Sequence, residues 1–205
     1  MVQVAEGGLS EISNIVIRLR ELGVQAASDT VGETERGFSD IEFQRLKDEV
    51  DRIARSTEFN GRKLLDGTGG IYEFQIGTKN DPILDRLRFD ATAADGTLAS
   101  LGISAETVAT KEGAQTTLKK LDDALVQING VRADMGATQN RLQSTINNLG
   151  ISDENLSAAN SRIRDVDVAS ETAELARNNI LVQSGTSVLS QANTIPNGIA
   201  QKLIG

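Results

Sequence analysis

The chain has 205 residues, no cysteine, no histidine and a formal net charge of −8. Without cysteine and histidine, disulfides, thiolate chemistry, most metal sites and most general-base catalysis are excluded, because imidazole is the usual proton carrier near neutral pH. The acidic balance disfavours nucleic acid, and no apolar run approaches the roughly 20 residues that a membrane-spanning helix needs, so we expect neither nucleic-acid binding nor membrane insertion.

The N-terminal part predicts two helices with a break between them. Apolar residues recur at alternating steps of three and four from Leu9 to Ala26, which predicts a helix over residues 3–28. The polar stretch 28–37 (SDTVGETERG) is rich in turn-forming residues and should end this helix. The same apolar spacing resumes at Phe43 and predicts a second helix over residues 39–56.

Residues 57–104 predict a β-hairpin region. Asn60-Gly61 and Asp66-Gly67 are strong turn signals. After them the apolar period changes from helical to two, which is typical of strands. The alternating apolar residues, which lie on either side of a turn at 77–82, are Tyr72, Phe74, Ile76, Leu87 and Phe89.

The C-terminal part predicts two more helices. A heptad-like spacing from Lys111 predicts a long helix over residues 111–149, which Gly150 should end, and capping residues at 152–154 should start a last helix, over 153–170 and beyond. From about residue 168 a new apolar stripe recurs every seven residues, and such a repeat favours pairing with another helix. Its members are Val168, Leu175, Val182 and Leu189, with Leu181 and Val188 beside them.

These elements define the expected fold class. Because only 3% of the residues are aromatic, long helices packed along narrow seams are favoured over a compact globule. We predict an α+β fold that is predominantly α: an elongated antiparallel helical bundle, or rod, with a β-hairpin region. No other helix of the chain is left unpaired to cover the stripe after residue 168, so we expect this tail to be mobile unless a partner holds it.

Four stretches resemble bacterial flagellin. The segment 154–193 (ENLSAANSRIRDVDVASETAELARNNILVQSGTSVLSQAN) is similar to the C-terminal signature of that family. Residues 1–28 resemble the segment that leads into its rod-like core, STEFNGRKLLDG the turn after the second helix, and MGATQNRLQSTINNL the middle of the long C-terminal helix. The resemblance covers about three quarters of the chain, far more than a short motif.

The resemblance implies a function, a location and partners. It implies a secreted structural subunit, not an enzyme, that needs no cofactor and self-assembles into the extracellular filament of the bacterial flagellum. The implied partners are further copies of the chain, a flagellar export chaperone on the C-terminal segment, and the filament cap and junction proteins. It further implies a core rod domain over residues 1–170 and a C-terminal inner-domain helix over 171–205. We expect this chain to lack the family's N-terminal segment, which pairs with that helix, and to have little or no variable outer domain.

The resemblance also implies two sets of site residues. One is a patch contacted by a host Toll-like innate immune receptor: Arg18, Leu22, Gln25 and Glu42. The alternative interpretation of this patch is that Arg18 and Glu42 are ordinary solvated charges and that Leu22 is an ordinary core residue. The second set is an assembly or chaperone-binding tail: Val168, Leu175, Leu181, Val182, Val188, Leu189, Ile199 and Leu203. For the last few of these residues a frayed terminus is the alternative.

Three rival functions stay open at this point. A hook-filament junction protein shares related terminal helices, although the signature at 154–193 fits flagellin better. An enzyme embedded in a flagellin scaffold would need an inserted catalytic domain and usually histidine. Asp165 and Asp167 do not supply an acid/base pair, because residues two apart on a helix point away from each other. The third rival is a general helical interaction module.

Overall fold

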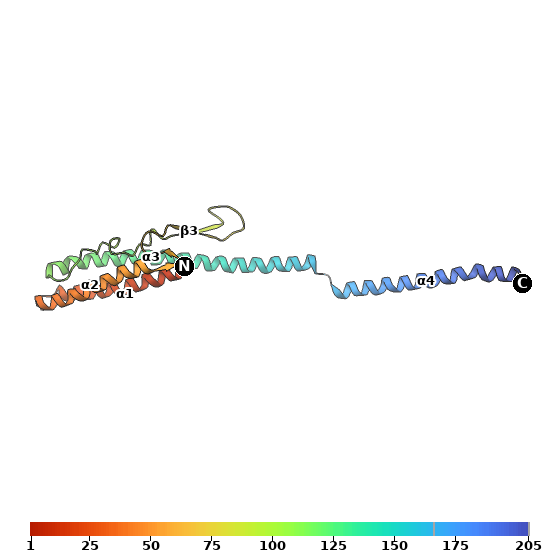
Figure 1. The fold of residues 1–205 in the computed structure, drawn as a ribbon, viewed down its shortest axis with the longest axis horizontal. Coiled ribbons are helices and arrows are strands. Elements are labelled where there is room, and N and C mark those ends of the chain that lie inside the picture. Colours follow the sequence, from red (N-terminus) through yellow and green to blue (C-terminus); the bar gives the residue numbers. More distant parts are fainter. Residues whose placement is uncertain (166, 205) are drawn as a thin grey trace. The chain divides into compact units, whose positions relative to one another are not determined.

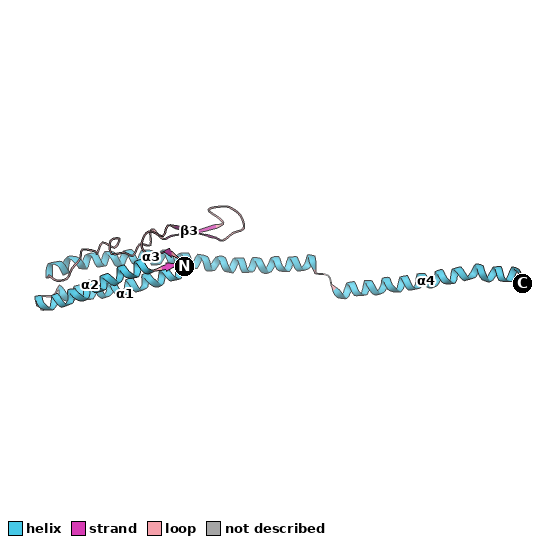
Figure 2. Cartoon of the chain, viewed as in Figure 1, coloured by secondary structure: helices cyan, strands magenta, loops and turns pink. Residues whose placement is uncertain are grey.

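A computed structural model of the chain describes residues 1–165 and 167–204, with side chains described up to Thr194 except at position 166. The elements in chain order are α1 (Val2–Ala26), α2 (Glu33–Ser56), β1 (Glu58–Phe59), β2 (Arg62–Lys63), β3 (Ile71–Gln75), β4 (Arg86–Asp90), α3 (Lys111–Arg164) and α4 (Val168–Ile204). Helices dominate and the strands are short (Figure 2). The predicted fold class, a helical bundle with a β-hairpin region, is confirmed. Two compact units divide the chain, Met1–Asn148 and Leu149–Gly205.

In the first unit α1, α2 and residues 111–148 of α3 form a bundle (Figure 1). Helix α1 runs antiparallel to α3, since Arg20 lies 2.6 Å from Asp122 and Glu6 lies 2.9 Å from Arg132. It also runs antiparallel to α2, since Arg18 pairs with Glu42 whereas Ala26, at the end of α1, contacts Arg36. The apolar stripes that the helical spacing places on one face of each helix meet in one core. Its largest fully buried side chains on the helices are Leu9, Ile12, Val16, Leu19, Phe43, Val50, Leu121, Ile128 and Met135.

Helix α2 begins at Glu33, six residues before the predicted start. The reason is Arg36, whose buried guanidinium donates to the backbone carbonyl of Ala26 at 2.8 Å and to that of Ser28 at 2.9 Å. Carbonyls at the end of a helix lack partners within that helix. Arg36 satisfies the carbonyl of Ala26, the last residue of α1. The polar stretch at 33–38 is therefore helical, and only residues 27–32 form the connection.

Both turn signals and the predicted hairpin are confirmed. Strands β1 and β2 pair through a two-residue turn in which Asn60 has φ 53° and Gly61 has φ 73°, the left-handed backbone that Asn-Gly favours. Strands β3 and β4 pair antiparallel with Tyr72 opposite Phe89, and the two rings stack with centroids 6.2 Å apart. This apolar face packs onto the core of the bundle.

The predicted break after Gly150 is wrong, because α3 continues through it to Arg164. A single glycine inside a helix costs only about 1 kcal/mol relative to alanine, and the helix formers around it are sufficient. Helix α4 begins instead at Val168, where the apolar stripe changes. Asp167 caps this start, since its carboxylate accepts hydrogen bonds from the backbone N–H groups of Ala169 at 3.0 Å and Ser170 at 3.4 Å.

Candidate functional site

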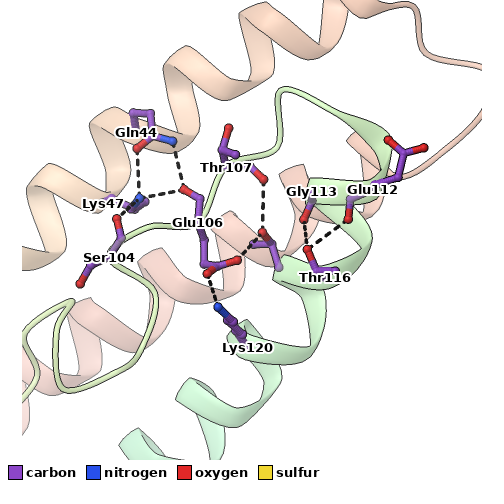
Figure 3. A network of polar contacts seen from close by, with 10 residues as sticks. Gln44, Lys47, Ser104, Glu106, Thr107, Glu112, Gly113, Thr116 and Lys120 are labelled. Atoms are coloured by element: carbon purple, nitrogen blue, oxygen red, sulfur yellow. Dashed lines mark hydrogen bonds and ion pairs between the residues drawn. The ribbon is translucent and has the colours of Figure 1, made fainter.

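A polar network joins α2 to the segment that leads into α3 (Figure 3). Lys47 of α2 is buried, and its ammonium group donates to the backbone carbonyls of Ser104 at 2.7 Å and Glu106 at 2.8 Å. Burial lowers the pKa of Lys47, and the charges of Asp40 and Glu106 oppose that shift. Asp40 accepts a hydrogen bond from the backbone N–H of Val108 at 2.8 Å. Helix α2 thus anchors this connecting segment at several points.

Glu106 extends the network to α3. Its carboxylate accepts hydrogen bonds from the hydroxyl of Thr117 at 3.0 Å and from the ammonium group of Lys120. Burial alone would raise the pKa of Glu106, but these hydrogen bonds and the charges of Lys120 and Lys47 outweigh burial and hold the pKa below its ordinary value of 4.5. Every polar group named here has a partner inside the fold, so the network holds helices together and is not arranged for chemistry.

The network predicts an acid-sensitive contribution to stability. A carboxyl group whose pKa is lowered by folding stabilises the fold above its unfolded pKa, and this stabilisation is lost as the pH falls through the folded pKa. We expect Glu106→Gln to reduce the free energy of unfolding by about 1–3 kcal/mol near pH 7. Near pH 3 the difference from the wild type should shrink, and urea unfolding at both pH values measures it. An equal difference at both would contradict the assignment.

Sequence reasoning missed this network. For Lys47 a signal was present, since it lies four residues after Phe43 and three before Val50 and therefore on the buried face of α2. A lysine on an apolar face calls for buried acceptors. Nothing in the sequence singles out Glu106, whose acceptor role depends on the path of an irregular segment.

The predicted receptor patch is only partly assembled on the surface. Arg18 of α1 and Glu42 of α2 form an exposed ion pair at 2.9 Å, and Arg18 also pairs with Glu21 at 3.0 Å. Gln25 is exposed on the same helix. Leu22 is only 3% exposed and belongs to the core, as the alternative interpretation had it. Three of the four predicted residues are therefore accessible, whereas Leu22 packs in the core of the bundle.

The predicted tail lies on α4. Every described side chain of this helix is exposed. The residues at strict seven-residue intervals are Val168, Leu175, Val182 and Leu189, which we call the α4 stripe, and Leu181 and Val188 lie beside it. Residues 178–201 carry no charge. The side chains of Ile199 and Leu203 lie outside the described residues, so this part of the tail stays a prediction.

A second seven-residue repeat was recognised only in part from the sequence. It runs along the whole of α3, and we call it the α3 seam: Ala114, Leu121, Ile128, Met135, Leu142, Leu149, Leu156 and Ile163. Its members up to Met135 are buried and Leu142 is partly buried, whereas Leu149, Leu156 and Ile163 are 46%, 70% and 87% exposed. The predicted break at Gly150 hid this continuity. The same spacing that builds the bundle thus continues on an exposed surface.

Other kinds of site find no support in the described part of the chain. Among residues 1–165 and 167–204 no cluster of three or more His, Cys, Asp or Glu side chains could hold a metal ion. None of the helices within those ranges combines the length and apolar character that crossing a bilayer requires. The exposed apolar repeats are therefore the main candidates for a functional surface.

Comparisons with known proteins agree with this picture. Residues 1–69 match the family described as the bacterial flagellin N-terminal helical region, and residues 118–203 match the bacterial flagellin C-terminal helical region. A flagellin of Halalkalibacterium halodurans is 39% identical over 203 residues, covering 99% of this chain and 74% of that one. A flagellin of Bacillus subtilis is 40% identical over 232 residues, covering 99% and 76%. The crystal structure of Bacillus cereus flagellin has a TM-score of 0.64 at 34% identity, covering 77% of this chain and 89% of that one.

Proposed function

Since the chain belongs to the bacterial flagellin family, and is therefore a non-enzymatic structural subunit of the flagellar filament, we propose that it self-assembles through the exposed part of the α3 seam and the α4 stripe. One observation supports this most: the seam is buried against helices up to Met135 and continues at the same spacing with exposed residues. A repeat of seven favours a helical partner. We propose that helices of neighbouring subunits in the polymer are this partner.

The two parts of the chain then have different roles. We propose that residues 1–170 form a core rod domain, and that 171–205 form an inner-domain helix that is mobile before assembly and held by neighbours afterwards. The exposed apolar side chains of α4 support this division, because isolated helices are marginal in water. A tail that is ordered only by neighbours would delay polymerisation until subunits meet at a growing end.

Further partners follow from the same surface. We propose that a flagellar export chaperone covers Leu181, Val188 and Leu189 before secretion, by placing the helix in an apolar groove. Ile199 and Leu203 would extend that contact. Filament cap and junction proteins would meet the same repeat at the ends of the polymer, and the assembled filament would lie outside the cell.

Filament elongation tests the proposed function. Labelled full-length protein should add to sonicated filament seeds and extend them in proportion to its concentration, as seen by fluorescence and electron microscopy. A hook-filament junction protein, the alternative, would add a short segment and then stop. An interaction module would add nothing. Either of the last two outcomes would contradict the assembly role of the repeats.

We also propose that a host Toll-like receptor contacts Arg18, Gln25 and Glu42 on the monomer. Exposed arginine beside apolar residues is typical of interface anchors, which supports this proposal. Arg18→Ala should weaken receptor signalling in a reporter cell assay by about tenfold or more, a value typical of such anchors. The matched control is Arg20→Ala, which also removes an exposed α1 ion pair but lies about 200° around the helix. Equal effects of the two changes would contradict the proposal.

A further inference from the structure

Three arginines gather where the β3–β4 hairpin meets α3. Arg86 and Arg88 of β4 and Arg141 of α3 line an open pocket of about 390 Å³, whose remaining walls are Pro82, Ile83 and Leu87. All of these residues belong to the first compact unit. The chain as a whole carries a net charge of −8, so this group of cations is opposite in sign to its overall charge.

The cations of this pocket are incompletely neutralised. Glu73 is shared, since its carboxylate lies 3.1 Å from Arg86 and 2.9 Å from Arg88. Arg141 makes no ion pair with any carboxylate of the described residues. One carboxylate is therefore shared by two of the three guanidinium groups, and the third has none among those described. The acidic side chain of Asp81 in the adjoining loop is occupied, because it accepts hydrogen bonds from the backbone N–H groups of Ile83 at 2.8 Å and Leu84 at 3.0 Å.

The geometry also limits which ligand fits. Guanidinium groups present paired N–H donors that match the oxygens of phosphate and sulfate. Ile83 is highly exposed at the rim of the pocket and Leu87 is buried at its wall, so an apolar surface adjoins the cations. We propose that this pocket binds a tetrahedral oxyanion, a phosphate or sulfate group, with Arg141 as the uncommitted donor and Arg86 and Arg88 as the donors that Glu73 holds in place.

Titration of the full chain with inorganic phosphate tests this proposal. At constant ionic strength set with sodium chloride, the NMR signals of Arg86, Arg88 and Arg141 should shift together and saturate. Arg141→Gln should weaken the affinity by about tenfold, the usual order for one charge-assisted contact. Glu73→Gln should strengthen it, because the competing carboxylate charge is removed and only one side-chain oxygen is left to accept a hydrogen bond from Arg86 or Arg88.

Arg45→Gln is the matched control, since it removes an exposed arginine of α2 that does not line the pocket. It should leave phosphate binding unchanged. Shifts that do not saturate, shifts that chloride reproduces, or equal losses in Arg141→Gln and Arg45→Gln would overturn the proposal. Circular dichroism checks that each variant is folded.

A second titration distinguishes two sources of the oxyanion. A sulfated polysaccharide such as heparin presents the same group on a polymer. If both phosphate and heparin saturate the same three arginine signals, the pocket accepts a free anion and also an oxyanion group that is carried on a polysaccharide. Saturation by phosphate alone would support the site and assign it to small anions, and saturation by neither would overturn it.

Discussion

Phe43→Ala is expected to lower the free energy of unfolding of the bundle by about 3–5 kcal/mol. Phe43 is fully buried in the core of the first unit, and Lys47, which anchors the segment before α3, lies over its ring at 5.8 Å. Removing the ring leaves a cavity and also loosens the support of that lysine. Urea unfolding followed by tyrosine fluorescence measures the loss, because Tyr72 is the only tyrosine of the chain and is buried in this unit.

The same helix provides a matched control. Phe38 is 67% exposed, so Phe38→Ala removes an identical ring that is already mostly in water. We expect a change within about 0.5 kcal/mol, as for most surface substitutions. Similar losses for both variants would show that the burial of Phe43 does not stabilise the bundle and would contradict the described core.

Replacing two residues of the α4 stripe should have the largest effect on assembly. Val182→Asp combined with Leu189→Asp places two carboxylates seven residues apart on the face that we expect to be covered by other helices. Burying an unpaired charge costs several kcal/mol. We therefore expect elongation from filament seeds to fall by at least about a hundredfold, which corresponds to about 3 kcal/mol. Both side chains are exposed in the single chain, so its free energy of unfolding should not change.

The control for this pair lies on the same helix. Ser184→Asp with Gln191→Asp adds the same charges at the same spacing, on exposed positions about 200° around the helix from the stripe. Elongation should then fall far less. If both double variants elongate equally well or equally poorly, the stripe is not the assembly face.

Much of the fold could be predicted from local patterns. The spacing of apolar residues located α1 and α2, the alternation around Tyr72 located the β3–β4 pair, and Asn60-Gly61 marked the turn between β1 and β2, because these signals act within a few residues. One error lies where a distant group decides, and the other where neighbouring helix formers outweigh a single glycine. The early start of α2 depends on the contact of Arg36 with the end of α1, and the uninterrupted course of α3 past Gly150 depends on helix formers on both sides.

The candidate surfaces were predictable to a smaller extent. The α4 stripe is visible as a strict repeat, since periodicity carries its own signal in the sequence. The exposure of a single side chain has no such sequence signal, so the predicted receptor patch included Leu22 although this residue is buried. The pocket of Arg86, Arg88 and Arg141 could not be predicted, because it combines a strand pair with a helical residue, Arg141, that lies more than fifty positions further along the chain.

The contact of Arg36 also bears on the order in which the chain folds. It joins residues only eight and ten positions apart, so α1 and α2 can associate through a short loop with little loss of chain entropy. The contacts of α3 with α1 and α2 join residues that are separated by the whole hairpin region, and such long-range contacts form more slowly. We therefore expect α1 and α2 to form an early folding unit, to which the remaining elements are added. Within it, unwinding of the first turn of α2 would remove Arg36 from the end of α1 and leave the carbonyl of Ala26 without this partner.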